Sequence, residues 1–376
     1  MHGEAQSLFV KKAPMQLSEI IIKRIQDNGP ISFRDFMEWA LYYPGLGYYT
    51  SGSEKIGEKG DYYTSPVLSA LYGQMIGRQL EEMWEIMNKE PISIVEYGAG
   101  TGALCFDILN YLKKNTALYR HLAYYIIEKN TSVKNSSHDL LKEKVKWIND
   151  INDIGRISGC VLSNEVVDNF SVNLVTMRDE LMEVFVDYKN EFVEVLKPAS
   201  DELKNYLQIQ NVLLPKNYRT EINLQAVEWL KQIADHLKRG YVITVDYGFN
   251  ANELYSEKRN LGTLACYYKH SVTDLPYSNI GLQDITAHVN FSALRHWGER
   301  YGLELSGFCN QNYFLRSLGL ADHLRKQELE SPNSKEGLVQ LNKLLVEMGN
   351  KFKVLIQHKG LSIQPLRGMQ FSQKLF

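Results

Sequence analysis

The middle of the chain alternates short apolar runs with amphipathic helical patterns. The apolar runs are residues 92–98, 123–128, 145–148, 160–164 and 241–248. Helical patterns at 103–113 and 224–238 separate them, and a helix at 291–301 with strands at 303–308 and 353–357 continues the series. Strand, helix and strand at this spacing predict right-handed βαβ units, which form a mostly parallel sheet with helices on both faces.

Two regions depart from this alternation. Near the N-terminus, helices are predicted at 17–26, 33–42 and 68–87, and the segment 43–66 carries five glycines among tyrosines. A loop of this length and composition is predicted to be a lid or a binding loop. Residues 174–196 alternate apolar and polar positions between turn signals, which predicts an antiparallel β insertion.

These patterns divide the chain into two parts. A helical cap with its glycine- and tyrosine-rich loop is predicted over residues 1–90. One α/β core is predicted over 91–376, with insertions at about 171–220 and 249–290. The length of 376 residues suits such an elaborated single core.

Composition limits the classes of function. The chain carries 42 basic and 44 acidic side chains, a formal net charge of −2, which argues against an electrostatic nucleic-acid binder. Its four cysteines are scattered without a Cys-x-x-Cys pair, so we expect reduced thiols and neither a disulfide framework nor a metal site. No apolar stretch is long enough for a signal peptide or a membrane span. We therefore expect a soluble protein of the bacterial cytoplasm, with the mitochondrial matrix as the alternative.

The strongest local signal is the glycine-rich turn after the first apolar run. Gly98, Gly100 and Gly102 let the backbone turn sharply and let a ligand lie against it. A dinucleotide site would place the third glycine one residue later, and Glu96 is a poor neighbour for pyrophosphate. Glu128 stands 128 − 102 = 26 residues past the last glycine, where a carboxylate can take both hydroxyls of a ribose. This set predicts S-adenosyl-L-methionine (SAM), an unphosphorylated nucleoside with an amino-acid tail; a tight turn with surface acids is the alternative.

Polar side chains gather after two later strands. Asn164, Glu165 and Asp168 follow the fourth apolar run, and Asp246 lies at the end of the fifth. Because ligands of open α/β sheets bind beyond the carboxyl ends of the strands, we expect these residues beside the transferable methyl group. Helix capping is the alternative for Asp168. His288, in a dense polar loop, joins the catalytic candidates, although a lone histidine is more often structural.

Seven segments form a series of motifs along the chain. They are GDYYTSP (60–66), EYGAGTGAL (96–104), SNEVVDNF (163–170), VDYGF (245–249), GTLACYYKH (262–270), QDITAHVNFSAL (283–294) and FKVL (352–355). In this order the chain resembles the MidA-type family of SAM-dependent methyltransferases over roughly residues 15–360. That family includes a mitochondrial complex I assembly factor that methylates arginine on a complex I subunit.

The resemblance implies an α/β protein of the class I, Rossmann-like methyltransferase fold, with a seven-stranded sheet, SAM as cofactor and protein arginine as acceptor. It also implies cofactor contacts from Gly60, Asp61 and Thr64 of the first motif and from Asn164. The family usually shows Asn-Glu-Phe-Phe-Asp-Ala-Leu-Pro where this chain has NEVVDNFS at 164–171. The polar positions are kept, whereas loss of the aromatics and the proline reshapes the pocket wall and leaves the acceptor open.

Together these observations predict a protein-arginine methyltransferase. We expect Glu165, with Asp168 or Asp246, to hold the guanidinium, whose pKa above about 12 keeps it charged. The protein substrate is expected to be a respiratory-complex subunit, and a homodimer is allowed for; neither nucleic acid nor membrane insertion is expected. Three alternatives stay open. They are a SAM-binding assembly protein without methyl transfer, a methyltransferase for another acceptor and, disfavoured by the glycine spacing, an NAD-linked oxidoreductase.

Overall fold

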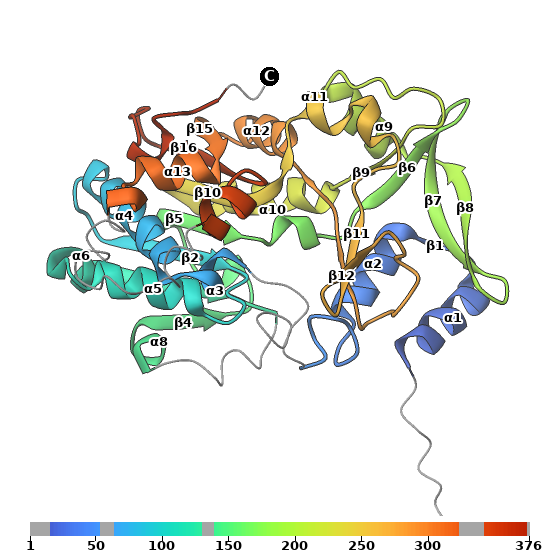
Figure 1. Ribbon diagram of the computed structural model, residues 1–376, viewed down its shortest axis with the longest axis horizontal. Helices are drawn as coiled ribbons and strands as arrows, with labels where there is room; N and C mark the ends of the chain where they lie inside the picture. Colours follow the sequence, from blue (N-terminus) through green and yellow to red (C-terminus); the bar gives the residue numbers. More distant parts are fainter. Residues whose placement is uncertain (1–15, 53–63, 130–138, 323–341, 374–376) are drawn as a thin grey trace, which may run out of the picture.

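The structure, a computed structural model, describes residues 16–52, 64–129, 139–322 and 342–373. Two large sheets stand out in these residues (Figure 1). One is the mostly parallel sheet at the left of the view, and the other is an antiparallel sheet at the right. In the described residues, no helix is both long and apolar enough to cross a membrane.

The parallel sheet has the order β15-β16-β10-β5-β2-β3-β4, and β14 pairs with the end of β10. Its strands are β2 (Ile92–Tyr97), β3 (Leu122–Ile127), β4 (Val145–Ile148), β5 (Ile157–Asn164), β10 (Leu237–Phe249), β14 (Val289–Asn290), β15 (Glu304–Asn310) and β16 (Phe352–Lys359). Strand β16 runs antiparallel to both of its neighbours, and the other pairs are parallel. The predicted mostly parallel, seven-stranded sheet is confirmed, with β14 as a short addition.

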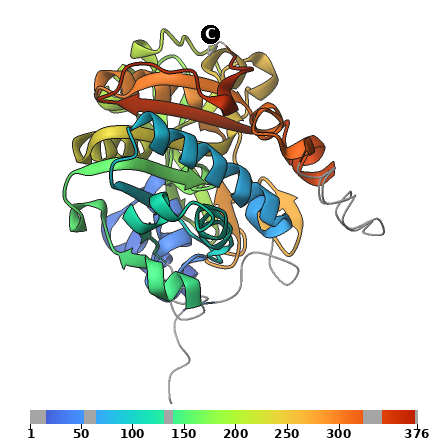
Figure 2. The same cartoon turned by 90° about the vertical axis from the view of Figure 1, so that its left-hand side faces the viewer.

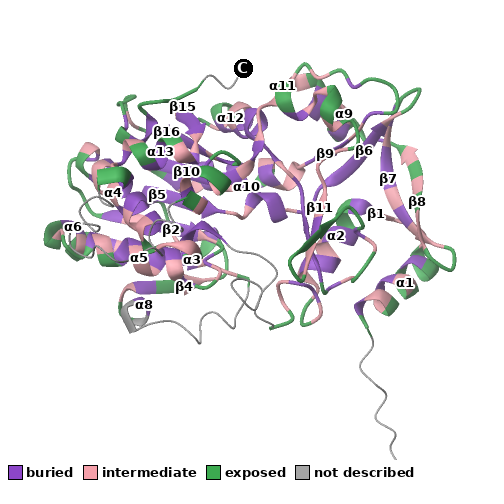
Figure 3. Cartoon of the chain, in the orientation of Figure 1, coloured by how far each residue is buried: buried purple, intermediate pink, exposed green. Residues whose placement is uncertain are grey.

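Helices cover both faces of this sheet. In β2, Ile94 packs into the core on one face and Val95 into the core on the other, as side chains alternate along a strand. The helices of the two layers are α4 (Ala70–Ile86), α5 (Ala103–Leu112) and α13 (Gln311–Ser317) on one face, and α10 (Leu224–His236) and α12 (Phe291–Arg300) on the other. The layers can be followed in Figure 2, and Figure 3 shows the strands between them as largely buried.

The antiparallel sheet is the predicted β insertion, joined by the N-terminal segment. Its strands are β1 (Ile31–Ser32), β6 (Asn173–Met177), β7 (Leu181–Tyr188), β8 (Phe192–Pro198) and β9 (Arg219–Ile222). Helices α1 (Leu17–Asn28) and α2 (Phe33–Tyr42) pack on it and form a third apolar core. Ser32 begins α2 by accepting the Asp35 N–H at 3.1 Å. The N-terminal cap is thereby attached to the insertion.

A small third sheet lies within the predicted insertion at 249–290. Its strands are β11 (Ala265–Tyr268), β12 (Ser271–Thr273) and β13 (Asp284–Thr286). The remaining short elements are α6 (Thr116–His121), α8 (Asp139–Lys144), α9 (Asp201–Ile209), α11 (Ala251–Leu254), η1 (Ile151–Asp153), η2 (Val167–Asn169), η3 (Glu257–Arg259), η4 (Lys343–Met348) and η5 (Arg367–Met369).

The helix predicted at 68–87 is α4, which begins two residues later than expected. A single turn, α3 (Ser65–Leu68), precedes α4, and Ser69 between them is extended with φ −162° and ψ 130°. The Ser69 hydroxyl accepts the Leu71 N–H and so begins the second helix. Because Ser65 is the first residue of α3, its N–H has no partner within that helix and is available to a side chain from another part of the chain.

Candidate active site

A cavity of ≈ 1540 Å³ opens beyond the carboxyl ends of the central strands. Strands β2 and β5 are neighbours there, although the chain runs from β2 to β3 and β4 before it returns to β5. Such a switch in strand order is where open α/β sheets bind ligands. The cavity is lined by the glycine turn after β2, by the residues after β5, by Tyr42 and Tyr49 of the N-terminal cap, and by Asp284 of β13.

The glycine turn forms one end of the cavity. Gly98, Gly100 and Gly102 have φ values of +69°, +55° and +79°, a region that other residues enter only with strain. A Cβ on Gly98 would lie 2.6 Å from Cγ2 of Val166. The turn therefore needs its glycines, and its bare backbone forms the cavity wall.

Two carboxylates flank this turn. Glu96 is buried and accepts the Tyr124 hydroxyl at 2.6 Å, and burial raises its pKa to about 7. Glu128, directly after β3, accepts the N–H of Gly100 at 3.1 Å. Both line the cavity beside the glycine turn, and their contacts to SAM stay predictions.

The segment after β5 carries the next carboxylate. Glu165 has φ +56°, and its backbone N–H bonds the carbonyl of Val245 at 2.9 Å, which fixes this strained residue at the strand end. Its Oε1 accepts the N–H of Ser65 at 3.3 Å and the side-chain N–H of Asn164 at 3.1 Å. Burial, reinforced by Asp168, raises the pKa of Glu165 to about 8.

Asp246 has a different task from the one expected. Its Oδ2 accepts the backbone N–H groups of Val166, Val167 and Asp168 at 3.2, 3.0 and 3.3 Å. It is fully buried and does not line the cavity. Asp246 therefore holds the η2 turn in place, and the structure separates it from the cavity carboxylates with which the sequence groups it.

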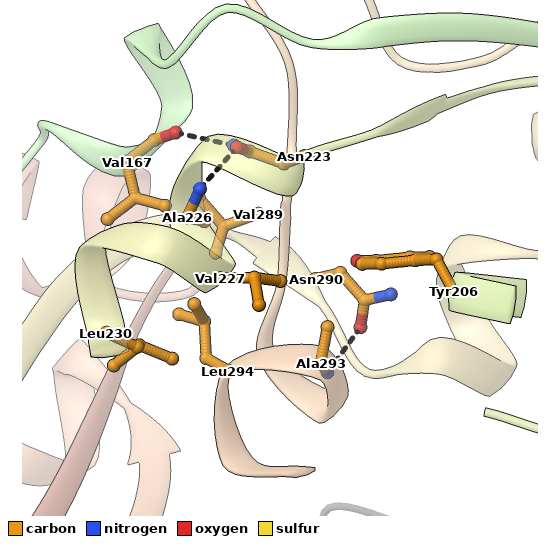
Figure 4. A pocket seen from close by; sticks show the side chains of 10 residues that line it. All are labelled: Val167, Tyr206, Asn223, Ala226, Val227, Leu230, Val289, Asn290, Ala293 and Leu294. Atoms are coloured by element: carbon orange, nitrogen blue, oxygen red, sulfur yellow. Dashed lines mark hydrogen bonds between the residues drawn. The ribbon is translucent and has the colours of Figure 1, made fainter. Parts of the chain in front are cut away.

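The η2 turn presents Asp168, whose carboxylate is buried. Within the described residues its Oδ1 has no hydrogen-bond partner. Burial raises the pKa of Asp168, because nothing around it compensates fully for the lost water. A second contact holds the η2 turn. Asn223, which caps α10, donates its side-chain N–H to the carbonyl of Val167 at 3.2 Å. Both residues line a small apolar pocket (Figure 4).

Asp284 is a further carboxylate in the cavity, and no pattern in the sequence singled it out as a site residue. It accepts the Tyr49 hydroxyl at 2.9 Å and the side-chain N–H of Asn169 at 3.2 Å. Burial, reinforced by Asp168, raises the pKa of Asp284 to about 8. The motif at 283–294 contains this residue, but its proximity to Asp168 depends on the bond from Ala287 N–H to the Asp168 carbonyl at 3.0 Å, which joins the insertion to η2.

Glu165, Asp168 and Asp284 form what we call the acceptor cluster. In the described part of the chain, no ion pair joins any of the three to a lysine, arginine or histidine. Among the described residues, no group of His, Cys, Asp and Glu is arranged to hold a metal ion. The cluster therefore brings together three carboxyl groups that no described cation neutralises, and their raised pKa values reflect this.

His288 and the first motif border the same cavity. The His288 ring packs edge-on against Tyr247 at 5.0 Å, and burial, with Arg259 and Lys351, lowers its pKa to about 4. It is therefore a neutral imidazole at physiological pH. Thr64 and Asn164 also line the cavity, whereas the predicted contacts Gly60 and Asp61 lie outside the described residues.

Comparisons with known proteins agree with this geometry. Residues 75–309 match a family described as "Putative S-adenosyl-L-methionine-dependent methyltransferase". The chain is 25% identical to the mouse mitochondrial protein arginine methyltransferase NDUFAF7, over 91% of this chain and 84% of that protein. It is 27% identical to the mitochondrial NDUFAF7 homologue of Caenorhabditis elegans, over 90% and 85%. A superfamily member from Burkholderia thailandensis, crystallised with S-adenosyl-homocysteine, is 29% identical, with a TM-score of 0.85 and 95% of both chains covered.

These matches bear directly on the predictions. The matched region contains the glycine turn and the acceptor cluster, and the ligand of the Burkholderia protein is SAM without its methyl group. The two relatives are named as mitochondrial, so the cytoplasmic location stays a prediction without support from them. The predicted fold, cofactor and MidA-type family are confirmed. The chain belongs to this family and is a SAM-dependent methyltransferase.

Proposed function

We propose that this methyltransferase acts on the side chain of arginine in a protein. The observation that carries the proposal is the acceptor cluster: three carboxylates, of which Asp168 and Asp284 are buried and Glu165 is half-buried, line the cavity, and no described cation is paired with them. A guanidinium supplies a permanent positive charge and five N–H donors in a planar fork, which suits several carboxylates at once. Both relatives described above are named protein arginine methyltransferases, which supports the same acceptor.

The carboxylates have two tasks in this reaction. They orient the guanidinium so that one terminal nitrogen faces the methyl donor, and they hold its positive charge on the other nitrogens. That nitrogen gains a methyl group and loses a proton, so the acceptor stays singly charged. Glu165 and Asp284, whose pKa values burial raises to about 8, can take up this proton near neutral pH.

The other end of the cavity fits the cofactor. SAM, when bound, supplies an activated methyl group on a sulfonium. Gly98 and Gly100 line the cavity and offer bare backbone to SAM, with Gly102 completing the turn. Glu128 would take the ribose hydroxyls, and Glu96, which also lines the cavity, stays a predicted cofactor contact. Thr64 and Asn164 are the further contacts that the family resemblance implies, and both border the cavity.

The predicted partners remain part of the proposal. A respiratory-complex subunit as the methylated protein is supported only by what the resemblance implies. The homodimer and the role of the tyrosine-rich loop as a lid also stay predictions. Tyr49 of that loop and Tyr42, the last residue of α2, line the cavity, whereas residues 53–63 lie outside the described part.

Labelled methyl transfer tests the acceptor. Purified protein with SAM carrying a labelled methyl group is added to a lysate of cells that lack the gene, and labelled residues are identified by mass spectrometry. The proposal expects methylarginine. Label on another residue type would assign another acceptor, and SAM binding without any labelled protein would favour the assembly-protein alternative.

Glu165→Gln tests the cluster. The substitution keeps the shape of the side chain but removes its charge, so transfer to arginine should fall by roughly 100-fold or more while SAM affinity is kept. Glu191→Gln, at an exposed turn, is the matched control. Unchanged transfer by folded Glu165→Gln protein would contradict the assignment.

A further inference from the structure

A chain of hydrogen bonds reaches Glu165 from helix α4. Tyr72, which is 1% exposed, donates its hydroxyl to Oδ1 of Asn164 at 2.5 Å. The side-chain N–H of Asn164 in turn donates to Oε1 of Glu165 at 3.1 Å. Tyr72 contacts Asn164 and does not line the cavity itself.

The orientation of the Asn164 carboxamide decides which atom faces Glu165. Its oxygen accepts and its NH₂ donates, so a half-turn of the group would exchange an N–H donor for an oxygen lone pair beside the carboxylate. The Tyr72 hydroxyl favours one orientation because it donates to the oxygen. Burial, with Glu165 and Asp246 nearby, raises the pKa of Tyr72 well above its ordinary value, so the hydroxyl stays protonated and remains a donor.

We propose that Tyr72 is a positioning residue: it locks Asn164 with its N–H toward Glu165 and thereby favours the ionised form of the Glu165 carboxylate that would hold the guanidinium. The part about the guanidinium rests on the proposed function, whereas the part about the charge of Glu165 does not. A donor to a carboxylate stabilises its ionised form, and an oxygen in the same place stabilises the protonated form. Loss of the Tyr72 hydroxyl therefore shifts the titration of Glu165 to higher pH.

The surroundings of Glu165 are otherwise constant. Asp168, Asp246 and Tyr267 are the further titratable groups that interact with it. The Ser65 N–H from α3 also donates to it. Lys343, Glu347 and Lys351 line the same cavity. None of these groups is altered by a substitution at Tyr72, so a change in the titration reports the Asn164 contact.

Carbon-13 NMR of protein labelled at the glutamate δ-carboxyl tests the proposal without any acceptor. The Glu165 signal is assigned by its loss in Glu165→Gln, and its titration is followed in wild type and in Tyr72→Phe. We expect the midpoint to rise by roughly one pH unit in Tyr72→Phe. Tyr218→Phe is the matched control, since this buried hydroxyl donates to the carbonyls of Leu254 and Ser256 away from the cavity.

Asn164→Asp gives a second, nearly isosteric test in which Tyr72 is kept. An oxygen now faces Glu165 in either orientation, so the midpoint should rise by at least as much. An unchanged midpoint in Tyr72→Phe, or in Asn164→Asp, would overturn the positioning role.

Enzyme assays then test whether the ionisation of Glu165 controls methyl transfer. With an arginine peptide methylated by the wild type, and with SAM at a saturating concentration, the acid limb of the kcat/KM profile for the peptide should move to higher pH in Tyr72→Phe. A shifted NMR midpoint with an unshifted pH profile would remove the link to arginine and contradict the proposed function, whereas an unshifted midpoint would contradict the positioning role alone.

Discussion

The two ends of the cavity are built in different ways. The cofactor end comes from one stretch of chain, in which β2, its glycine turn and the end of β3 follow one another within residues 92–128. The acceptor end combines side chains from three distant segments; Tyr49 and Asp284 are hydrogen-bonded although 235 positions separate them. A local turn is enough to hold a ligand that many enzymes share, whereas the acceptor site depends on how the insertions pack.

The two ends also differ in how far the charge of their carboxylates is compensated. At the cofactor end, Glu96 is buried with Tyr124 as its hydrogen-bond donor. At the acceptor end, Asp168 and Asp284 are buried beside the half-buried Glu165, and Glu165 adopts a strained backbone with φ +56°. Strain and raised pKa values of this kind concentrate at sites whose ligand compensates for them. Substitutions should therefore separate transfer from cofactor binding.

Asp168→Asn should separate the two ends most strongly. Loss of one buried carboxylate facing a guanidinium should lower kcat/KM for the arginine acceptor by roughly 100- to 1,000-fold. The SAM dissociation constant, measured by calorimetry, should stay within about twofold, because no hydrogen bond among the described residues joins the Asp168 carboxylate to the glycine turn. Asp179→Asn, at a solvent-exposed ion pair with Lys216, is the control and should change neither quantity. Weakened SAM binding by Asp168→Asn would show that the ends are not independent.

Glu128→Ala should weaken SAM binding at the cofactor end. It removes the carboxylate that accepts the Gly100 N–H and that would take the ribose hydroxyls. Hydrogen bonds to a charged group are each worth about 1.5–3 kcal/mol, so the SAM dissociation constant should rise by roughly 10- to 100-fold. Transfer at saturating SAM should change little. Wild-type SAM affinity in this variant would remove Glu128 from the cofactor site.

The fold could be predicted from the sequence where the spacing of apolar residues shows which faces of a helix or strand are buried. The strand predicted at 160–164 lies in the buried strand β5, and the helix predicted at 33–42 begins after its cap Ser32, because each depends on local pattern or capping. The break at Ser69 did not show in the periodicity, since a capping serine keeps the apolar spacing of the helix nearly intact. The small sheet β12-β11-β13 carries too few residues to show a period of two.

Only the cofactor end of the site could be predicted from the sequence. Three glycines with positive φ are a local requirement and therefore appear in the sequence. Asp246 and Glu165 both lie at strand ends, and nothing local distinguishes a carboxylate that receives backbone N–H groups from one that faces a ligand. Asp284 belongs to the acceptor cluster through the packing of an insertion, which no local pattern encodes.

The pH dependence of stability should sharpen the electrostatic contrast. The pKa values of Glu165 and Asp284 are raised to about 8 from ordinary values of 4.5 and 3.8, so the folded state holds more protons than the unfolded state between these limits. The free energy of unfolding of the ligand-free protein should therefore fall as pH rises from 6.5 to 8, by about 1 kcal/mol per pH unit for each group. His288 contributes little there, because its folded pKa of about 4 and ordinary value of 6.5 both lie at or below this range.

Denaturant unfolding at several pH values measures this slope. The double variant Glu165→Gln with Asp284→Asn should make it shallower, since neither replacement titrates. The slope that remains comes from Glu96, Asp168 and Asp246, whose pKa values burial also raises. A stability that rises between pH 6.5 and 8 would contradict the burial of uncompensated carboxylates at the acceptor end.

The smallest expected effect concerns a single hydroxyl of the cap, and two stacked tyrosines offer a matched pair. The rings of Tyr42 and Tyr49 lie 5.6 Å apart; Tyr49 donates to the Asp284 carboxylate at 2.9 Å, and Tyr42 donates to the backbone carbonyl of Asn169 at 3.1 Å. Tyr49→Phe removes a donor that favours ionised Asp284, so KM for the arginine peptide should rise by about 2- to 5-fold, and more at pH 6.5 than at pH 8. Tyr42→Phe removes no donor from a carboxylate, so any change in KM should be equal at the two pH values. Equal pH dependence in the two variants would mean that the cap shapes the acceptor end by packing alone.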